Sequence, residues 1–256
     1  MSAEQPNAEP AGLVSRFVAS PNHGERVGGR RPDLLLLHYT GMPTAEAALA
    51  RLCDPKAAVS SHYLVEENGT VVQLVPEDRR AWHAGAASWA GETDVNSISI
   101  GIEIANAGHD GGLPAYPDEQ IASVIALCRG IVADWGIPPE RVLAHSDVAP
   151  ARKEDPGELF PWDQLHKAGI GLWVEPAPVA DGAPLLAPGD TGAEVATVQE
   201  SLASYGYGVP RSGIFDEETR QVVAAFQRHF RPARVDGLVD ASTLATLERL
   251  LARLSA

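Results

Sequence analysis

Isoleucines alternate with small or polar residues between positions 98 and 105, and this pattern constrains the fold more than any other feature of the chain. A period of two is typical of a β-strand with one face in a core. The opposite face carries Glu103 among small residues, which leave room for a ligand beside its carboxylate. The core face is formed by Ile98, Ile100, Ile102 and Ile104.

A strand, a helix and a hairpin are predicted before the isoleucine strand. The apolar run 33–38 has the length of a strand and ends at His38. Thr44 is expected to cap a helix over residues 45–52. Asn-Gly between two runs of β-forming residues predicts a hairpin over 61–75.

The clearest helix follows the isoleucine strand. It opens at Asp118, carries apolar residues along one face, and ends at Gly136 and a Pro-Pro pair. A strand over 141–144 then leads into His145. His38 and His145 are therefore both expected at strand ends, where a sheet presents side chains to a shared rim.

A linker rich in proline and alanine at 174–186 divides the chain. It separates an expected main domain, residues 31–173, from a small helical domain, residues 187–256. Residues 1–30 are rich in proline, glycine and charge, and they are expected to form an arm on the surface.

The helical domain contains an internal repeat. The pattern Gly-apolar-apolar-Asp-x-x-Thr occurs at 213–219 and again at 237–243. Aspartate before a helical segment is a favoured cap, so Asp216 and Asp240 are each expected to begin a helix.

The segment from His145 to Gly157 carries metal-binding side chains. His145 and Asp155 lie ten positions apart, and a catalytic zinc needs three protein ligands and one open position. His38 is the candidate third ligand, so we expect these three residues to hold one Zn²⁺ per chain. A site with one anionic ligand stays net positive, which lowers the pKa of a bound water.

Glu103 and Lys153 are the candidate catalytic residues beside this site. Glu103 can take a proton from water and pass it to a leaving amine. Lys153 either offers a cation to an oxyanion or is a solvated surface residue, and its spacing leaves both interpretations open.

The other histidines and the cysteines give weaker signals. His83 is expected to line a cleft, whereas His62 either lines it or satisfies hydrogen bonds in the core. Cys53 and Cys128 form no CxxC pair, and nothing requires a disulfide between them. A surface position is expected for His23, His109, His166 and His229.

Together, these segments resemble the zinc-dependent N-acetylmuramoyl-L-alanine amidases of the amidase-2 group, the AmpD/AmiD branch related to peptidoglycan-recognition proteins. The resemblance covers most of residues 31–173 and implies an α/β fold with a mixed sheet flanked by helices. It rests on Leu37-His38-Tyr39-Thr40, Ser61-His62-Tyr63-Leu64-Val65, Arg80-Ala81-Trp82-His83-Ala84-Gly85, Asn96-Ser97-Ile98-Ser99-Ile100-Gly101-Ile102-Glu103, and His145 through Phe160-Pro161-Trp162.

Carried over residue by residue, the resemblance implies zinc ligation by His38, His145 and Asp155, with catalytic roles for Glu103 and Lys153. One departure is Ala144, where many relatives have glycine. Candidate substrate contacts from the same motifs are Tyr39, His62, Trp82, His83 and Asn96.

Residues 187–256 resemble the peptidoglycan-binding type 1 domain, a three-helix module. The resemblance implies that this domain holds an enzyme near its polymer and raises the local substrate concentration. The alternative is a helical addition that only stabilises the main domain, since no binding site is legible in its sequence.

The resemblance implies hydrolysis of the amide between N-acetylmuramic acid and L-alanine, in peptidoglycan or in anhydro-muropeptides. One alternative is a protein that binds wall fragments without cutting them, and another is a zinc hydrolase of some other amide. The formal charge of −14 argues against nucleic acid as a partner. We expect a monomer without a membrane span, located in the cytoplasm, or in the periplasm if a leader was removed.

Overall fold

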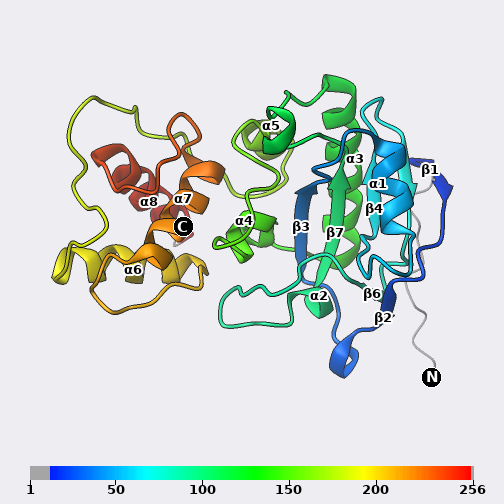
Figure 1. Ribbon diagram of the computed structural model, residues 1–256, viewed down its shortest axis with the longest axis horizontal. Helices are drawn as coiled ribbons and strands as arrows, with labels where there is room; N and C mark the ends of the chain where they lie inside the picture. Colours follow the sequence, from blue (N-terminus) through cyan, green and yellow to red (C-terminus); the bar gives the residue numbers. More distant parts are fainter. Residues whose placement is uncertain (1–11, 255–256) are drawn as a thin grey trace.

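The computed structural model describes residues 12–254, which form a part built around a sheet and a bundle of three helices beside it (Figure 1). The strands are β1 Val14–Phe17, β2 His23–Glu25, β3 Leu34–Tyr39, β4 Tyr63–Val65, β5 Val71–Gln73, β6 Arg79–Ala81, β7 Ser99–Ile104 and β8 Val142–Ala144. The α-helices are α1 Ala45–Leu52, α2 Val95–Ile98, α3 Asp118–Trp135, α4 His145–Val148, α5 Trp162–Lys167, α6 Ala193–Tyr205, α7 Glu217–Phe230 and α8 Ala241–Leu254.

The main sheet has six strands in the order β1-β5-β4-β7-β3-β8, and a separate pair joins β2 to β6. Only the β4–β5 pairing is antiparallel within the main sheet, so the sheet is mixed, as the sequence predicts. The α/β fold class with an added three-helix unit is confirmed.

Parallel pairing at the centre of the sheet brings distant residues to one edge. β7 and β8 lie on either side of β3, and all three run in the same direction. His38 is in register with Glu103, and Leu37 is in register with Ala144, the residue before His145. The carboxyl ends of these strands therefore meet, and they form the shared rim that the sequence predicts for His38 and His145.

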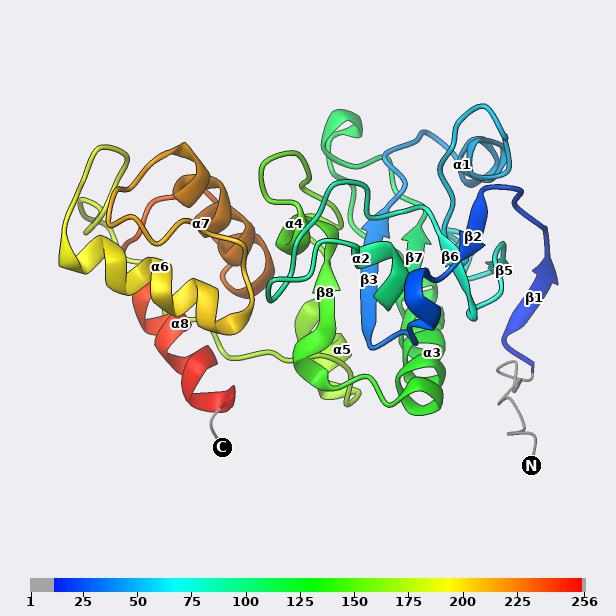
Figure 2. The same cartoon turned by 90° about the horizontal axis from the view of Figure 1, so that it is seen from below.

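Each face of the sheet is covered. Helix α3 packs on one face through Ile121, Val124 and Leu127, against alternate residues of β3 and β7 (Figure 2). The opposite face, including Leu34 and Leu36, belongs to a cluster that continues into the helical bundle. Burial of apolar side chains on both faces is typical of a sheet dominated by parallel strands.

Local sequence signals located most of these elements. Helices α1 and α3 cover 45–52 and 118–135, as predicted, and the Thr44 side chain accepts a hydrogen bond from the Ala47 amide. The predicted hairpin is formed by β4 and β5. Both cysteines are free.

The expectation of a surface arm at 1–30 needs correction for the part that the structure describes. Strand β1 extends the main sheet and β2 pairs with β6. The Arg26 side chain is buried and donates hydrogen bonds to the carbonyl oxygens of Glu77, Asn96, Ser97 and Ser99. These partners lie far away in sequence, so composition alone did not reveal them. Residues 1–11 lie outside the described range.

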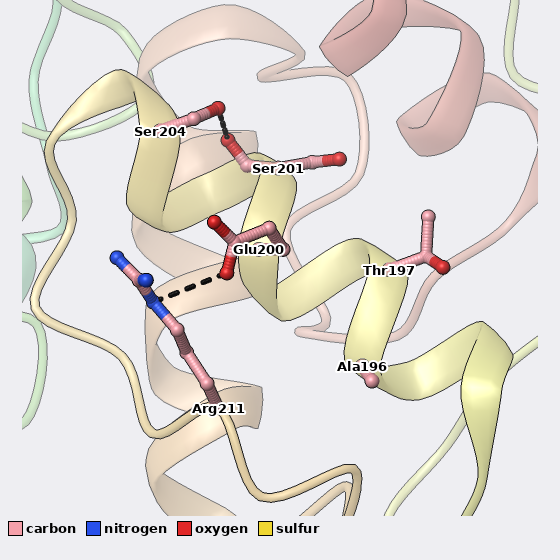
Figure 3. A pocket seen from close by; sticks show the side chains of 6 residues that line it. All are labelled: Ala196, Thr197, Glu200, Ser201, Ser204 and Arg211. Carbon is pink, nitrogen blue, oxygen red and sulfur yellow. Dashed lines mark hydrogen bonds and ion pairs between the residues drawn. The ribbon is translucent and has the colours of Figure 1, made fainter.

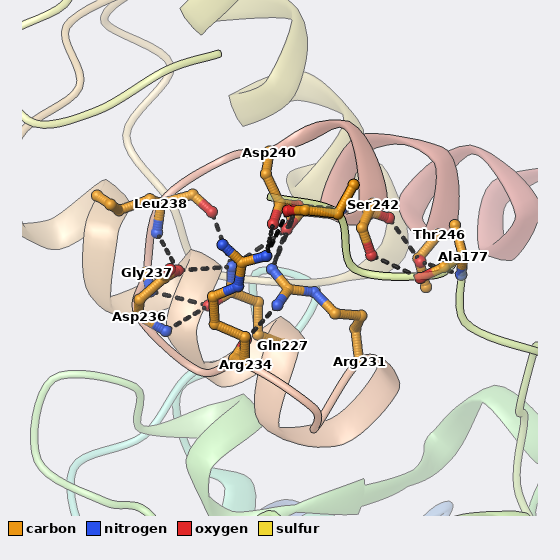
Figure 4. A network of polar contacts seen from close by, with 12 residues as sticks. Ala177, Gln227, Arg231, Arg234, Asp236, Gly237, Leu238, Asp240, Ser242 and Thr246 are labelled. Carbon is orange, nitrogen blue, oxygen red and sulfur yellow. Dashed lines mark hydrogen bonds and ion pairs between the residues drawn. The ribbon is translucent and has the colours of Figure 1, made fainter. Parts of the chain in front are cut away.

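The repeat in the helical bundle corresponds to two turns held by glutamines. Gln199 accepts from the Gly213 amide and donates to the Ile214 carbonyl, and Gln227 does the same with Gly237 and Leu238 (Figure 4). Each glutamine also donates to the threonine that ends the repeated pattern, Thr219 or Thr243. Buried polar side chains require such partners.

The predicted caps are confirmed in the same turns. Asp216 accepts from the Thr219 amide at the start of α7, and Asp240 accepts from the Thr243 amide at the start of α8. Across residues 12–254, no helix combines the length and the apolar character needed to cross a membrane.

Candidate metal centre and active site

Three sequence-predicted ligands converge at the edge of the sheet. His38 is the penultimate residue of β3, His145 begins α4, and Asp155 lies in the loop that follows. His38 Nδ1 and His145 Nδ1 are 2.9 Å apart, and Asp155 Oδ2 lies 3.1 and 2.9 Å from them. All three residues are buried. Among residues 12–254, they form the only group of three or more His, Cys, Asp or Glu side chains that could share one metal ion.

The donor set suits a small divalent cation. Ligand atoms about 2.0–2.1 Å from a tetrahedral Zn²⁺ lie roughly 3.3 Å apart. The three observed separations need to open by only a few tenths of an ångström to accept the ion at their centre. Two imidazoles and one carboxylate are ligands that zinc accepts, and three of them leave a fourth position open.

Hydrogen bonds on the far side of each imidazole hold Nδ1 toward the centre. His145 Nε2 lies 3.1 Å from the Ala84 carbonyl, which can only accept, so this nitrogen carries the proton and Nδ1 is free to bind a metal. His38 Nε2 lies 3.1 Å from His83 Nδ1. Metal-binding histidines commonly donate their second nitrogen to such a partner.

The partner of His38 is itself held in place. His83 Nε2 lies 3.3 Å from the Ser99 hydroxyl, which donates to the Val95 carbonyl at 2.6 Å. A consistent direction of donation therefore runs from His38 through His83 and Ser99 to the backbone.

Charges at the centre are set by burial and proximity. Burial, with the neighbouring His145, lowers the pKa of His38 to about 4, so its imidazole is neutral near pH 7. Burial alone would raise the pKa of Asp155, but the adjacent His145 and His38 rings outweigh it and hold this pKa far below its ordinary value. The centre thus combines the neutral imidazole of His38 with the ionised carboxylate of Asp155.

Glu103 offers a free carboxylate beside this centre. Its Oε2 atom is buried and has no hydrogen-bond partner among residues 12–254. Burial and the negative charge of Asp155 raise the pKa of Glu103 well above its ordinary value, while Lys153 opposes this effect. A buried carboxylate oxygen without a partner, on the wall of a cleft, is free to accept a proton or a hydrogen bond from a bound group.

A cleft of about 180 Å³ connects the centre to the surface. Glu103, Lys153, His145 and Asp155 line it, so the structure brings both candidate catalytic residues to the metal ligands. The remaining lining residues are Tyr39, Thr40, Met42, Ala48, Arg51, Leu52, Val59, Ser60, Trp82 and His83.

The candidate substrate contacts divide into two groups. Tyr39, Trp82 and His83 line the cleft, although His83 is also the partner of His38. His62 and Asn96 do not line it. The substrate-contact role of these two stays a prediction that the lining of this cleft does not support.

His62 and Asn96 have structural partners instead. His62 is fully buried, and its Nδ1 accepts from the Gly101 amide while Nε2 lies 3.2 Å from Arg26. Burial and the Arg26 charge lower its pKa to about 3. Asn96 Oδ1 accepts from the amides of His83 and Ala84, which fixes the loop that contacts both metal-binding histidines.

Several contributing groups escaped the sequence analysis. The Ala84 carbonyl is a backbone group, so the residue type at position 84 does not reveal it. Ser99 lies on the same face of the alternating strand as Glu103, so the period of two does contain the information that places it at the site. Arg51 of α1 lines the cleft because α1 packs beside the sheet edge, which is a tertiary contact.

A second, shallower hollow lies on α6 of the helical bundle (Figure 3). Its polar groups are hydroxyls and an ion pair between Arg211 and Glu200 at 3.2 Å, with both side chains more than half exposed. Exposed pairs contribute little stability, and the hollow contains no group of metal ligands.

Comparison with known proteins follows this division of the chain. The family model described as N-acetylmuramoyl-L-alanine amidase matches residues 28–158, and the model described as a peptidoglycan binding domain matches residues 191–247. The AmpD amidase of Enterobacter cloacae is 34% identical over 169 residues, which are 59% of this chain and 88% of AmpD.

Longer relatives match both parts of the chain. The amidase AmiD of Escherichia coli K12 is 42% identical over 233 residues, or 86% of this chain and 83% of AmiD. The solved complex of E. coli AmiD aligns with a TM-score of 0.73 at 41% identity, covering 89% of this chain and 91% of AmiD. AmpDh3 of Pseudomonas aeruginosa aligns with a TM-score of 0.73 at 31% identity, covering 89% and 94%. The chain therefore belongs to the N-acetylmuramoyl-L-alanine amidase family.

Proposed function

We propose that this chain is a zinc-dependent hydrolase that cleaves the amide between N-acetylmuramic acid and L-alanine in muropeptides. The observation that carries the proposal is the buried set of His38, His145 and Asp155, with the unpartnered carboxylate of Glu103 on the same cleft. His38 and Glu103 thus come from the neighbouring strands β3 and β7, and His145 and Asp155 come from the segment that follows β8.

His38, His145 and Asp155 would hold the ion, which would supply positive charge to activate a water and polarise a carbonyl. Glu103 accepts the proton of the attacking water on its carboxylate and returns it to the departing amine of L-alanine. The raised pKa of Glu103 suits both transfers, because this carboxylate holds a proton more tightly than an exposed one.

Lys153 balances negative charge on the reacting carbonyl oxygen. It is partly exposed, lines the cleft, and is two residues from Asp155. A cation fixed beside the developing oxyanion stabilises the transition state more than the ground state.

The relatives support a muropeptide as substrate. The AmiD complex contains anhydro-N-acetylmuramic acid-L-Ala-D-γ-Glu-L-Lys, described as its substrate, and AmpDh3 was solved with an anhydromuramic pentapeptide. We infer that the cleft between α1 and the Trp82 loop receives the same class of ligand. The match over residues 191–247 supports a second contact with the wall polymer.

The direct test is product analysis by mass spectrometry. The purified protein is incubated with intact sacculi and, separately, with soluble anhydro-muropeptides, each with and without a zinc chelator. We expect free stem peptides that begin with L-alanine, loss of this product on chelation, and recovery on adding Zn²⁺. The faster substrate distinguishes wall polymer from soluble fragments.

The binding-only alternative predicts a different result. A zinc-loaded protein that retains both substrates in a binding assay but releases no stem peptide refutes the hydrolase proposal. Cleavage of other amides, with muropeptides left intact, points instead to a different zinc hydrolase.

A further inference from the structure

The helical bundle contacts the segment that carries the metal ligand His145, the candidate catalytic Lys153 and the ligand Asp155. The contacts come from Tyr207, which follows α6, and from α7, whose neighbouring residues Arg228 and His229 reach opposite ends of this segment. Figure 1 shows α4 facing the bundle.

Asp147 makes the contact at the His145 end of this segment. It is fully buried, two residues after His145, and its Oδ2 accepts from the Ala144 amide at 2.8 Å. Its other hydrogen-bond partners among residues 12–254 come from the bundle. Tyr207 donates to Oδ1 at 2.6 Å, and His229 Nδ1 lies 2.7 Å from Oδ2. Asp147 therefore ties the first turn of α4 to two side chains of the bundle.

The other end of the segment is held by Arg228. This guanidinium lies 3.2 Å from Glu154 and 3.5 Å from Glu158. Glu158 lies 3.0 Å from His109 Nε2, and His109 Nδ1 lies 2.9 Å from the Tyr39 hydroxyl in the cleft. The contacts thus extend from α7 to the residue that follows His38.

These bonds lie next to a closely packed seam of aromatic side chains. Trp89 packs edge-on against Tyr205 and Tyr207, with ring centroids 5.3 and 5.1 Å apart. The Ala90 amide donates to the Gly206 carbonyl at 2.8 Å. His229 stacks on Trp162 at 3.8 Å, so the expected surface position of this histidine is wrong. Such a seam fixes the bundle to the main domain, because close packing leaves no freedom to slide.

We propose that the helical bundle is a fixed part of the metal centre, in which Tyr207 and His229 position His145 through Asp147. They are positioning residues, since they touch neither the metal site nor the cleft. This inference rests on the proposed zinc function and gives the bundle a role in addition to the proposed wall contact, namely support of the catalytic domain.

The chain contains a matched control for this proposal. Tyr205 and Tyr207 are both buried, both pack on Trp89, and lie two residues apart. Among residues 12–254, the Tyr205 hydroxyl has no hydrogen-bond partner, whereas the Tyr207 hydroxyl binds Asp147. Substitution of each by phenylalanine removes one oxygen from the same seam.

The experiment measures zinc affinity by competition with a chromogenic chelator in wild type, Tyr205→Phe and Tyr207→Phe. Removing an outer partner of a metal ligand typically weakens binding 10- to 100-fold. We expect about a 10-fold loss for Tyr207→Phe, at the lower end because Asp147 lies between, and an unchanged affinity for Tyr205→Phe. The free energy of unfolding of each metal-free protein is also measured, by urea titration.

A second pair of variants, both at Asp147, tests the same contact between the bundle and α4. Asp147→Asn keeps a side-chain oxygen for Tyr207 or the Ala144 amide and should retain more zinc affinity than Asp147→Ala. Equal zinc affinities for both tyrosine variants, or for both Asp147 variants, overturn the positioning role and leave a purely stabilising bundle. Failure of the wild type to bind zinc refutes the proposed function instead.

Discussion

Gly101 sits against the ring that supports the metal ligand His38, so adding one methyl group there tests the support directly. A Cβ at position 101 would lie 2.5 Å from Cγ and Nδ1 of His83 and 2.7 Å from its Cε1. The glycine has an ordinary φ, so Gly101→Ala introduces this close contact without backbone strain.

The size of the effect follows from these distances. To reach a normal contact of about 3.4 Å, the ring must retreat by about 0.9 Å. The His83–His38 hydrogen bond is 3.1 Å long and fails beyond about 3.5 Å, so that retreat exceeds its tolerance. Loss of the partner predicts zinc affinity weaker by roughly 10- to 100-fold, or about 1.4–2.7 kcal/mol.

The assay separates metal binding from folding. Zinc dissociation constants come from chelator competition, and free energies of unfolding come from urea titrations in EDTA, where overpacking predicts a loss of about 1–3 kcal/mol. Gly24→Ala is the matched control, because no atom lies within 4 Å of its added Cβ, and both quantities should stay near wild type. If Gly101→Ala binds zinc as tightly as wild type, His83 does not position His38.

Two other substitutions test separate parts of the site. Glu103→Gln should keep zinc affinity near wild type and lower kcat by roughly 10²- to 10⁴-fold, because the amide cannot accept the water proton. Glu67→Gln, on the exposed hairpin turn, is the control. Wild-type turnover by Glu103→Gln would show that Glu103 is not the general base. His62 tests the acid sensitivity of the metal-free fold. Its folded pKa is about 3, below the value of about 6.5 when unfolded, so the unfolded chain binds the proton first and stability falls as pH drops from 6.5 toward 3. Between pH 7 and 5 this group should cost about 2 kcal/mol, measured as the excess loss of unfolding free energy in wild type over His62→Gln. Equal losses in both proteins would show that His62 is not buried in its neutral form.

The arrangement of the site explains how a short, ordinary sheet builds a metal centre. His38 comes from β3, and the other two ligands come from the segment that follows β8. The parallel register of β3 and β8 brings these segments together, and β7 places Glu103 beside them. The loop of Trp82 to Gly85 then supplies the outer partners of both imidazoles, through the His83 ring and the Ala84 carbonyl. Neither imidazole depends on solvent for its orientation.

Sequence alone determined the features that depend on near neighbours. Thr44 as a cap, the Asn-Gly hairpin and the period of α3 are local, since each involves residues within a few positions of one another. The shared rim of His38 and His145 also followed from sequence, because both residues lie at the ends of predicted strands. The parallel pairing that places Glu103 beside them was shown by the structure. The internal repeat predicted two helix caps for the same local reason.

Only the tertiary structure decided the roles of buried polar residues whose partners are distant in sequence. His62 depends on Arg26, and His229 depends on Asp147, 82 positions earlier. A histidine in sequence has no preference between surface and core, because burial is favourable only when its ring nitrogens find partners. Those partners come from other elements, so the free energy that fixes such residues exists only once the chain has folded.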